Sequence, residues 1–169
     1  MSKRALKKYV AGLKKKQLEE QLLDLYDRFP AVKTYYDFVF NPREEKLIRE
    51  AKARISNEYF PLKRKRPRAR RSVAQKYIRK FIILGMDAPL VADLMLYNLE
   101  TAQLFSKEKK VPEAFYKSML NSFSEVVHYV TINGLLPECR SRLVAVYEIT
   151  QQDDWGNREG FSRALDIID

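Results

Sequence analysis

The chain has 169 residues, the size of one domain, and 46% of them are hydrophobic, which is enough to bury a substantial core. Five glycines are few for a β-rich protein, because sheets need many tight turns, so the composition favours helices. The only cysteine, Cys139, excludes an internal disulfide and favours a reducing compartment. We therefore expect a cytoplasmic protein without a disulfide-linked partner.

The charge of the chain is concentrated in two segments. The net charge is +10, and residues 1–16 and 63–71 each contain seven Lys or Arg and no acid. The rest of the chain has 18 basic and 22 acidic residues, a net charge of −4. The N-terminal segment lacks the apolar stretch of a secretory signal, and no apolar run approaches the length that spans a bilayer. We expect no membrane partner.

The N-terminal sequence predicts two antiparallel helices followed by an aromatic-rich stretch. Apolar residues recur at helical spacing along both, ending before Pro30: Leu6, Tyr9, Val10, Leu13, then Leu18, Leu22, Leu25, Tyr26 and Phe29. Aromatic residues then gather between Tyr35 and Phe40. At residues 41–44, Asn41 suits a helix N-cap and Glu44 a capping box, which predicts a helix that ends near Tyr59.

Residues 62–71 have no apolar periodicity and repel one another electrostatically, so they predict a solvated basic loop. Helical patterning resumes at residues 72–75, where Ser72 begins a second capping-box pattern, and it ends near Gly85. The helix after Asp87 has few polar positions, and no Lys or Arg occurs between Phe81 and Ser106. Such a helix is expected at the centre of the fold, covered on more than one side.

The strongest apolar stripe follows Pro112 and ends in helix-capping fashion at Asn133-Gly134. A further helix is expected from Pro137 and a short one over about 158–168. The sequence thus predicts an all-α protein with eight or nine helices, arranged as a compact bundle or as an irregular array of antiparallel helical hairpins. One domain, 1–169, is expected, in which the basic loop at 62–71 separates a helical part at 1–61 from another at 72–169.

Four segments together resemble an uncharacterised family of small bacterial proteins, typical of Bacteroidetes and known only as a domain of unknown function. These segments are residues 2–9 (SKRALKKY), 38–42 (FVFNP), 71–77 (RSVAQKY) and 114–123 (AFYKSMLNSF). The resemblance runs nearly end to end. It implies a bacterial cytosolic protein, and it brings no catalytic residue because the family has none assigned.

No pattern in the chain predicts a catalytic residue, a metal site or a cofactor. Zinc sites need several Cys or His ligands, and the chain contains one of each, His128 and Cys139. Glu125-x-x-His128 matches one element of a dinuclear metal site, but that site needs a second His. The spacings of the five glycines match neither phosphate-binding loops nor dinucleotide-binding fingerprints.

The basic loop is the one positive functional signal, since clustered Lys and Arg neutralise phosphates and release counterions. We expect a non-catalytic binding or adaptor protein whose basic surface contacts an acidic partner, either nucleic acid or acidic protein. The candidate contact residues lie in the loop and on the polar face of the next helix: Lys63, Arg64, Lys65, Arg66, Arg68, Arg70, Arg71, Lys76, Arg79 and Lys80. A basic loop that only increases solubility is the competing interpretation.

Two other functions remain open from sequence. An enzyme could assemble a carboxylate or tyrosine cleft from distant helices, with buried acids beside Tyr97 or His128. Alternatively, the aromatic-rich stretch between Tyr35 and Phe40 could form the interface of a homo-oligomer, which would make the chain a structural component.

Overall fold

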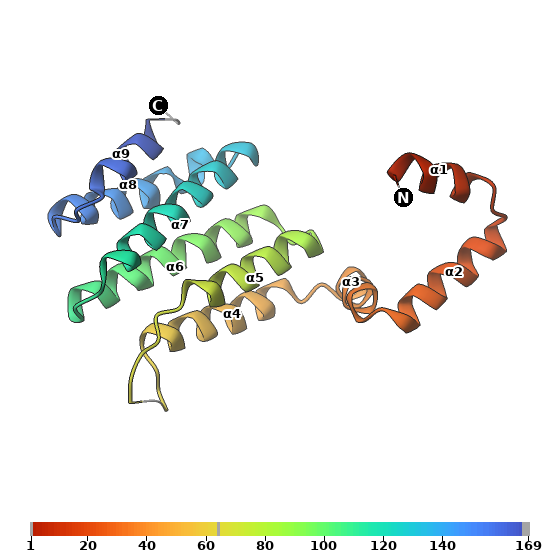
Figure 1. Ribbon diagram of the computed structural model, residues 1–169, viewed down its shortest axis with the longest axis horizontal. Helices are drawn as coiled ribbons and strands as arrows, with labels where there is room; N and C mark the ends of the chain where they lie inside the picture. The colour runs from red at the N-terminus through yellow and green to blue at the C-terminus, as the bar shows by residue number, and fades with distance from the viewer. Residues whose placement is uncertain (1, 64, 167–169) are drawn as a thin grey trace. The chain divides into compact units, whose positions relative to one another are not determined.

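The computed structural model describes residues 2–63 and 65–166, and these ranges contain nine α-helices and no strand (Figure 1). The predicted all-α fold is confirmed. The helices are α1 (Lys3–Ala11), α2 (Lys15–Arg28), α3 (Pro30–Phe40), α4 (Glu44–Tyr59), α5 (Arg71–Leu84), α6 (Ala88–Glu108), α7 (Glu113–Ile132), α8 (Leu136–Gln152) and α9 (Arg158–Leu165).

The chain divides into two compact units, residues 1–43 with α1–α3 and residues 44–169 with α4–α9. The division falls just before α4 and not at the basic loop. Helix α4, although it precedes the loop, packs against α5 and α6, which follow it. The loop is therefore a connection inside the second unit.

Helix α6 is the centre of the second unit, where it packs against α4, α5, α7 and α8 (Figure 1). Apolar side chains surround its axis, and eleven of its residues are buried. Two buried polar side chains on α6, Asn98 and Gln103, each have one hydrogen-bond partner on another helix. The Asn98 side-chain oxygen accepts a hydrogen bond from the Tyr59 hydroxyl at 3.2 Å, and the Gln103 amide donates to the Val146 carbonyl at 2.7 Å. The predicted central position of this helix is confirmed.

Helix α7 buries the predicted apolar stripe against α6, α8 and α9. Its Phe123 ring lies 4.9 Å from that of Phe161 on α9, and the Phe161 ring in turn lies 5.7 Å from that of Trp155. Helix α9 approaches α7 closely at Gly160, where a Cβ atom would lie 2.5 Å from a methyl carbon of Leu120. The C-terminal helices are thus fixed by close packing.

The helix ends predicted at two glycines are confirmed, but the two predicted capping boxes do not form. Gly85 and Gly134 adopt left-handed φ angles of +75° and +69° just beyond α5 and α7. Asn41 caps the end of α3 and not the start of α4, and the Glu44 carboxylate accepts from the Asp87 backbone N–H at 3.2 Å. Helix α5 begins at Arg71, one residue before Ser72, with no side-chain cap.

The first unit has a different character, because none of its described residues, 2–43, is buried. Ser2 caps the start of α1, and its hydroxyl accepts from the Ala5 N–H at 3.3 Å. Helices α2 and α3 pack together, and the Tyr26 hydroxyl donates to the Asp37 carboxylate at 3.1 Å. The hydrogen bond to this carboxylate raises the pKa of Tyr26. Apolar side chains on all three helices remain exposed.

Candidate functional site

The basic loop returns to the end of α4, where a helix leaves carbonyl groups without helical partners. The backbone N–H groups of Arg68 and Ala69 both donate to the Glu58 carbonyl at 3.0 Å. Ala69 has a φ of +48°, a conformation unusual for a residue with a side chain. The two hydrogen bonds hold the second half of the loop against the last turn of α4.

Arg70 anchors the loop through its side chain. Its guanidinium contacts both carboxylate oxygens of Glu58, at 2.8 and 3.1 Å, in a bidentate pair. The Glu58 side chain is 8% exposed, and a buried carboxylate requires such a partner. The hydrogen bond with Glu58 raises the pKa of Arg70. Arg70 therefore holds the loop in place, while its side chain remains 49% exposed.

Arg71 is the first residue of α5 and ties it to α7. Its Nε donates to the Ser122 hydroxyl at 2.7 Å, and a terminal nitrogen contacts Glu125 at 2.6 Å. The other Glu125 oxygen accepts from the Gln75 amide at 2.7 Å. The Glu125 carboxylate of the Glu-x-x-His pattern is thus engaged by Arg71 and Gln75. Among the described residues, no group of three or more His, Cys, Asp and Glu could hold a metal ion.

A groove of about 500 Å³ lies between the loop and the connection from α6 to α7. The loop side contributes Arg68, the start of α5 contributes Arg71, and the α6–α7 connection contributes Lys109 and Lys110. Apolar residues form the rest of the lining apart from Ser118: Pro67, Ala69, Phe105, Val111, Pro112, Ala114, Phe115 and Met119. The groove therefore combines four cationic residues with an apolar floor, and no carboxylate residue lines it.

Sequence analysis predicted half of these cations. Lys109 and Lys110 were missed, because about forty residues separate them from the loop and only the packing of α6 and α7 brings the two segments together. The available signal was a short run, residues 106–110 (SKEKK), directly before Pro112. That run is too short to stand out from an ordinary solvated helix end.

The other predicted contact residues lie elsewhere. Lys63, Lys65 and Arg66 are exposed in the loop, outside the groove lining, and Arg64 lies outside the described residues. The remaining three are exposed on α5: Lys76, Arg79 and Lys80. They stand away from the buried face of that helix, which Ile78 and Phe81 form. Of the predicted cations, only Arg68 and Arg71 therefore line the groove.

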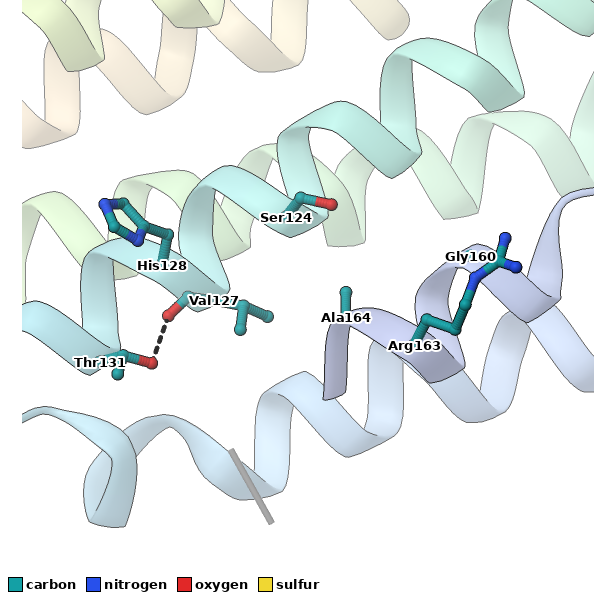
Figure 2. A pocket seen from close by; sticks show the side chains of 7 residues that line it. All are labelled: Ser124, Val127, His128, Thr131, Gly160, Arg163 and Ala164. Atoms are coloured by element: carbon teal, nitrogen blue, oxygen red, sulfur yellow. Dashed lines mark hydrogen bonds between the residues drawn. The ribbon is translucent and has the colours of Figure 1, made fainter. Parts of the chain in front are cut away.

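A second cavity, of about 300 Å³, lies between α7 and α9 beside His128 (Figure 2). Ser124, His128 and Thr131 line it from α7, and Arg163 lines it from α9. The Thr131 hydroxyl donates to the Val127 carbonyl at 2.8 Å. Figure 2 shows the Ser124 hydroxyl and the His128 imidazole pointing in different directions. They do not form the nucleophile–base pair that covalent catalysis requires.

The acids beside Tyr97 form an ion cluster that joins three helices. Arg142 of α8 contacts Glu100 at 2.7 and 2.9 Å and Asp93 at 2.8 Å, both on α6. Lys52 of α4 contacts Asp93 at 2.6 Å and lies 5.0 Å from the centre of the Tyr97 ring.

These contacts hold the Asp93 carboxylate in its charged form. Burial alone would raise the pKa of Asp93, but hydrogen bonds from Lys52 and Arg142 lower it below its ordinary value. The hydrogen bond to Glu100 raises the pKa of Arg142. General acid–base catalysis needs a group that titrates near neutral pH. The cluster is therefore suited to joining α4, α6 and α8 and not to proton transfer.

Cys139 is 9% exposed, and burial raises the pKa of its thiol. A nucleophilic cysteine requires the opposite shift, so Cys139 has the properties of a small core residue.

Over its described residues the protein is all-helical, and it contains a groove with basic residues above an apolar floor. None of the helices in the described ranges is long and apolar enough to cross a membrane. The chain belongs to a family of unknown function (DUF6155), whose sequence profile matches residues 1–169. Neither the curated proteins nor the solved structures include a significant match.

Proposed function

We propose that the chain is a non-catalytic binding protein whose basic groove receives an acidic partner. One observation carries the proposal: the fold brings Arg68 and Arg71 together with Lys109 and Lys110 around one groove that no carboxylate residue lines. Cations that gather in a concave, partly apolar site focus their field, so they attract an anionic partner more strongly than the same charges spread over a surface.

Three of the four cations are available to a ligand. Arg68, Lys109 and Lys110 are exposed, whereas Arg71 is committed to Ser122 and Glu125. The structural contacts of Arg70 and Arg71 fix the loop and the start of α5, and this fixes the groove wall before a partner arrives. A wall held in this way lowers the entropic cost of binding.

The floor favours an acidic protein segment over nucleic acid. The residues Phe105 and Phe115 are 6% and 7% exposed, too little for a base to stack on either ring. The floor instead offers apolar contact, and Ser118 is the one polar uncharged residue in the lining. Peptides that alternate acidic and apolar side chains match a cationic rim above such a floor. Nucleic acid would be held through its phosphates alone, without selection of base sequence.

The proposal is tested by fluorescence anisotropy with two labelled probes, a peptide of alternating acidic and apolar residues and a single-stranded oligonucleotide. Each is titrated at about 50 and 200 mM salt, because charge-driven binding weakens as salt rises. Arg68→Gln/Lys109→Gln/Lys110→Gln removes the groove cations. The matched variant Lys76→Gln/Arg79→Gln/Lys80→Gln removes the same charge from α5.

We expect the peptide to bind in a salt-dependent manner and the groove variant to weaken binding by about tenfold or more, from the loss of three charge contacts. The α5 variant should change the affinity little. Equal loss in both variants would mean that total charge, and not the groove, attracts the probe. Tighter binding of the oligonucleotide than of the peptide would identify nucleic acid as the partner class.

We further propose that the protein acts in the cytoplasm. The support is its single cysteine, which is buried and cannot form an internal disulfide.

A further inference from the structure

The surface of α1–α3 carries an inference that goes beyond the proposed function. The first unit contains many large apolar side chains, and several are strongly exposed, among them Leu23 at 64% and Phe40 at 80%. Other exposed apolar residues on these helices are Leu6, Tyr9, Val10, Leu22, Leu25, Phe29, Tyr35 and Val39. A unit of this size that buries no side chain cannot offset the entropy lost on folding. A partner surface must therefore cover these apolar faces if the three helices are to be stable.

The charges beside the apolar faces of α1 and α2 have opposite signs. Helix α1 contains four Lys or Arg and no acid, whereas α2 contains four acids between residues 19 and 27, and its three basic residues lie at its two ends. On α1, Lys3 lies three positions before the exposed Leu6, and Lys7 lies three positions before the exposed Val10. Residues three apart are neighbours on a helix surface, so the apolar face of α1 has a cationic border.

The matching feature on α2 is an apolar residue with an acidic border. Leu23 has Glu19 four positions before it, Glu20 three before it and Asp27 four after it. All three positions are neighbours of Leu23 on the helix surface. Leu23 therefore has three acidic neighbours on the helix surface, of which Glu19 also pairs with Lys15 at 3.7 Å.

The cationic border on α1 and the acidic border on α2 together indicate which partner docks on these helices. An acidic partner or an anionic surface would suit α1 and be repelled by α2, and a basic partner would do the reverse. A second copy of this chain offers an acidic α2 to the first copy's α1 and a basic α1 to the first copy's α2. A two-fold symmetric pair satisfies both contacts at once, because each surface is used twice.

We propose that α1 and α2 form a self-association surface on which a second copy of this chain docks, with α1 of one copy against α2 of the other. The contact covers Leu6, Val10 and Leu23 and pairs Lys3 and Lys7 with the acids around Leu23.

The test measures the mass of the full chain by sedimentation velocity between about 1 and 200 µM. Two charge-reversed variants are used: Lys3→Glu/Lys7→Glu on α1 and Glu20→Lys/Asp27→Lys on α2. A control, Lys46→Glu/Arg49→Glu, makes the α1 change on exposed positions of α4. Circular dichroism compares the helix content of each variant with that of the natural chain.

We expect the natural chain and the control to dimerise, and each reversed variant to dimerise at least about tenfold more weakly, because like charges then face each other. An equimolar mixture of the two reversed variants should dimerise again, since every acidic helix then meets a basic one. A variant that had merely failed to fold would not be rescued in this way.

Three results would overturn the proposal. The natural chain would remain a monomer throughout the range, or the reversed variants would dimerise as well as the natural chain, or the mixture would not recover. A natural chain that stays monomeric but binds vesicles of anionic lipid would identify a membrane surface as the occupant instead.

Discussion

The helices of residues 2–43 and those of residues 44–166 have the same kind of amphipathic pattern, but only the second group covers its apolar faces. Phe161 in α9 is completely buried, whereas Leu23 in α2 is 64% exposed. Both residues lie on helices whose sequences contain regular apolar and charged positions. An amphipathic pattern thus predicts that a helix forms and which face is apolar, and the tertiary fold decides whether anything covers that face.

The largest contrast between the units should appear when a large apolar side chain is truncated in each. Phe161→Ala removes a buried ring that contacts Phe123 and Trp155, and we expect it to lower the free energy of unfolding by about 3–5 kcal/mol. Leu23→Ala, at a protein concentration near 1 µM, should change it by less than about 0.5 kcal/mol. Urea denaturation followed by circular dichroism measures both, and equal losses would contradict the contrast.

The ion cluster on α4, α6 and α8 should give an intermediate effect. Arg142→Met leaves the carboxylates of Asp93 and Glu100 without their guanidinium partner, and we expect a loss of about 1–3 kcal/mol, because the cluster is about one-third exposed to solvent. The exposed pair of Arg158 with Asp154 is the control. Arg158→Gln should cost less than about 0.5 kcal/mol.

The same cluster predicts how stability depends on pH. The pKa of Asp93 is lower in the folded protein than in the unfolded chain, so its contribution is fully present above the unfolded pKa of about 4 and is lost as pH falls through the folded pKa. Asp93→Asn should therefore reduce the loss of stability between about pH 5 and pH 2. An unchanged pH profile in Asp93→Asn would contradict the role of the ion pairs.

The smallest effect concerns the loop itself. Arg70→Gln removes the bidentate contact with Glu58, and we expect faster hydrogen exchange of the Arg68 and Ala69 amides. Exchange in α6 should stay unchanged. Arg66→Gln, which changes an exposed loop residue, is the matched control and should alter neither region. Exchange at Arg68 that is the same in both variants would mean that Arg70 does not anchor the loop.

Sequence patterns predicted the helices better than their contacts. The absence of Lys and Arg between Phe81 and Ser106 predicted the central helix, and Gly85 and Gly134 predicted two helix ends, because these features act locally or through simple burial. Helix α3 was not predicted as a separate helix, since Pro30 reads equally well as the end of one helix or the start of the next.

Only half of the groove cations could be predicted, because local sequence patterns do not show which distant segments come together. Arg68 and Arg71 lie in a conspicuous basic run, but Lys109 and Lys110 join them only through the packing of α6 and α7. Glu44 illustrates the limit at a single residue. The sequence assigned its carboxylate to the start of its own helix, and in the fold it accepts a hydrogen bond from Asp87, forty-three positions away. Local patterns do not specify such long-range partners.

The contrast between the two units is tested most directly by hydrogen exchange on the full chain at about 1 and 100 µM. We expect the amides of α4–α9 to be protected equally at both concentrations, because their core is complete within one molecule. Amides of α1 and α2 should exchange quickly at 1 µM and become protected at 100 µM, when a second copy covers their apolar faces. Strong protection of α1 and α2 that does not change with concentration would contradict this division of the chain.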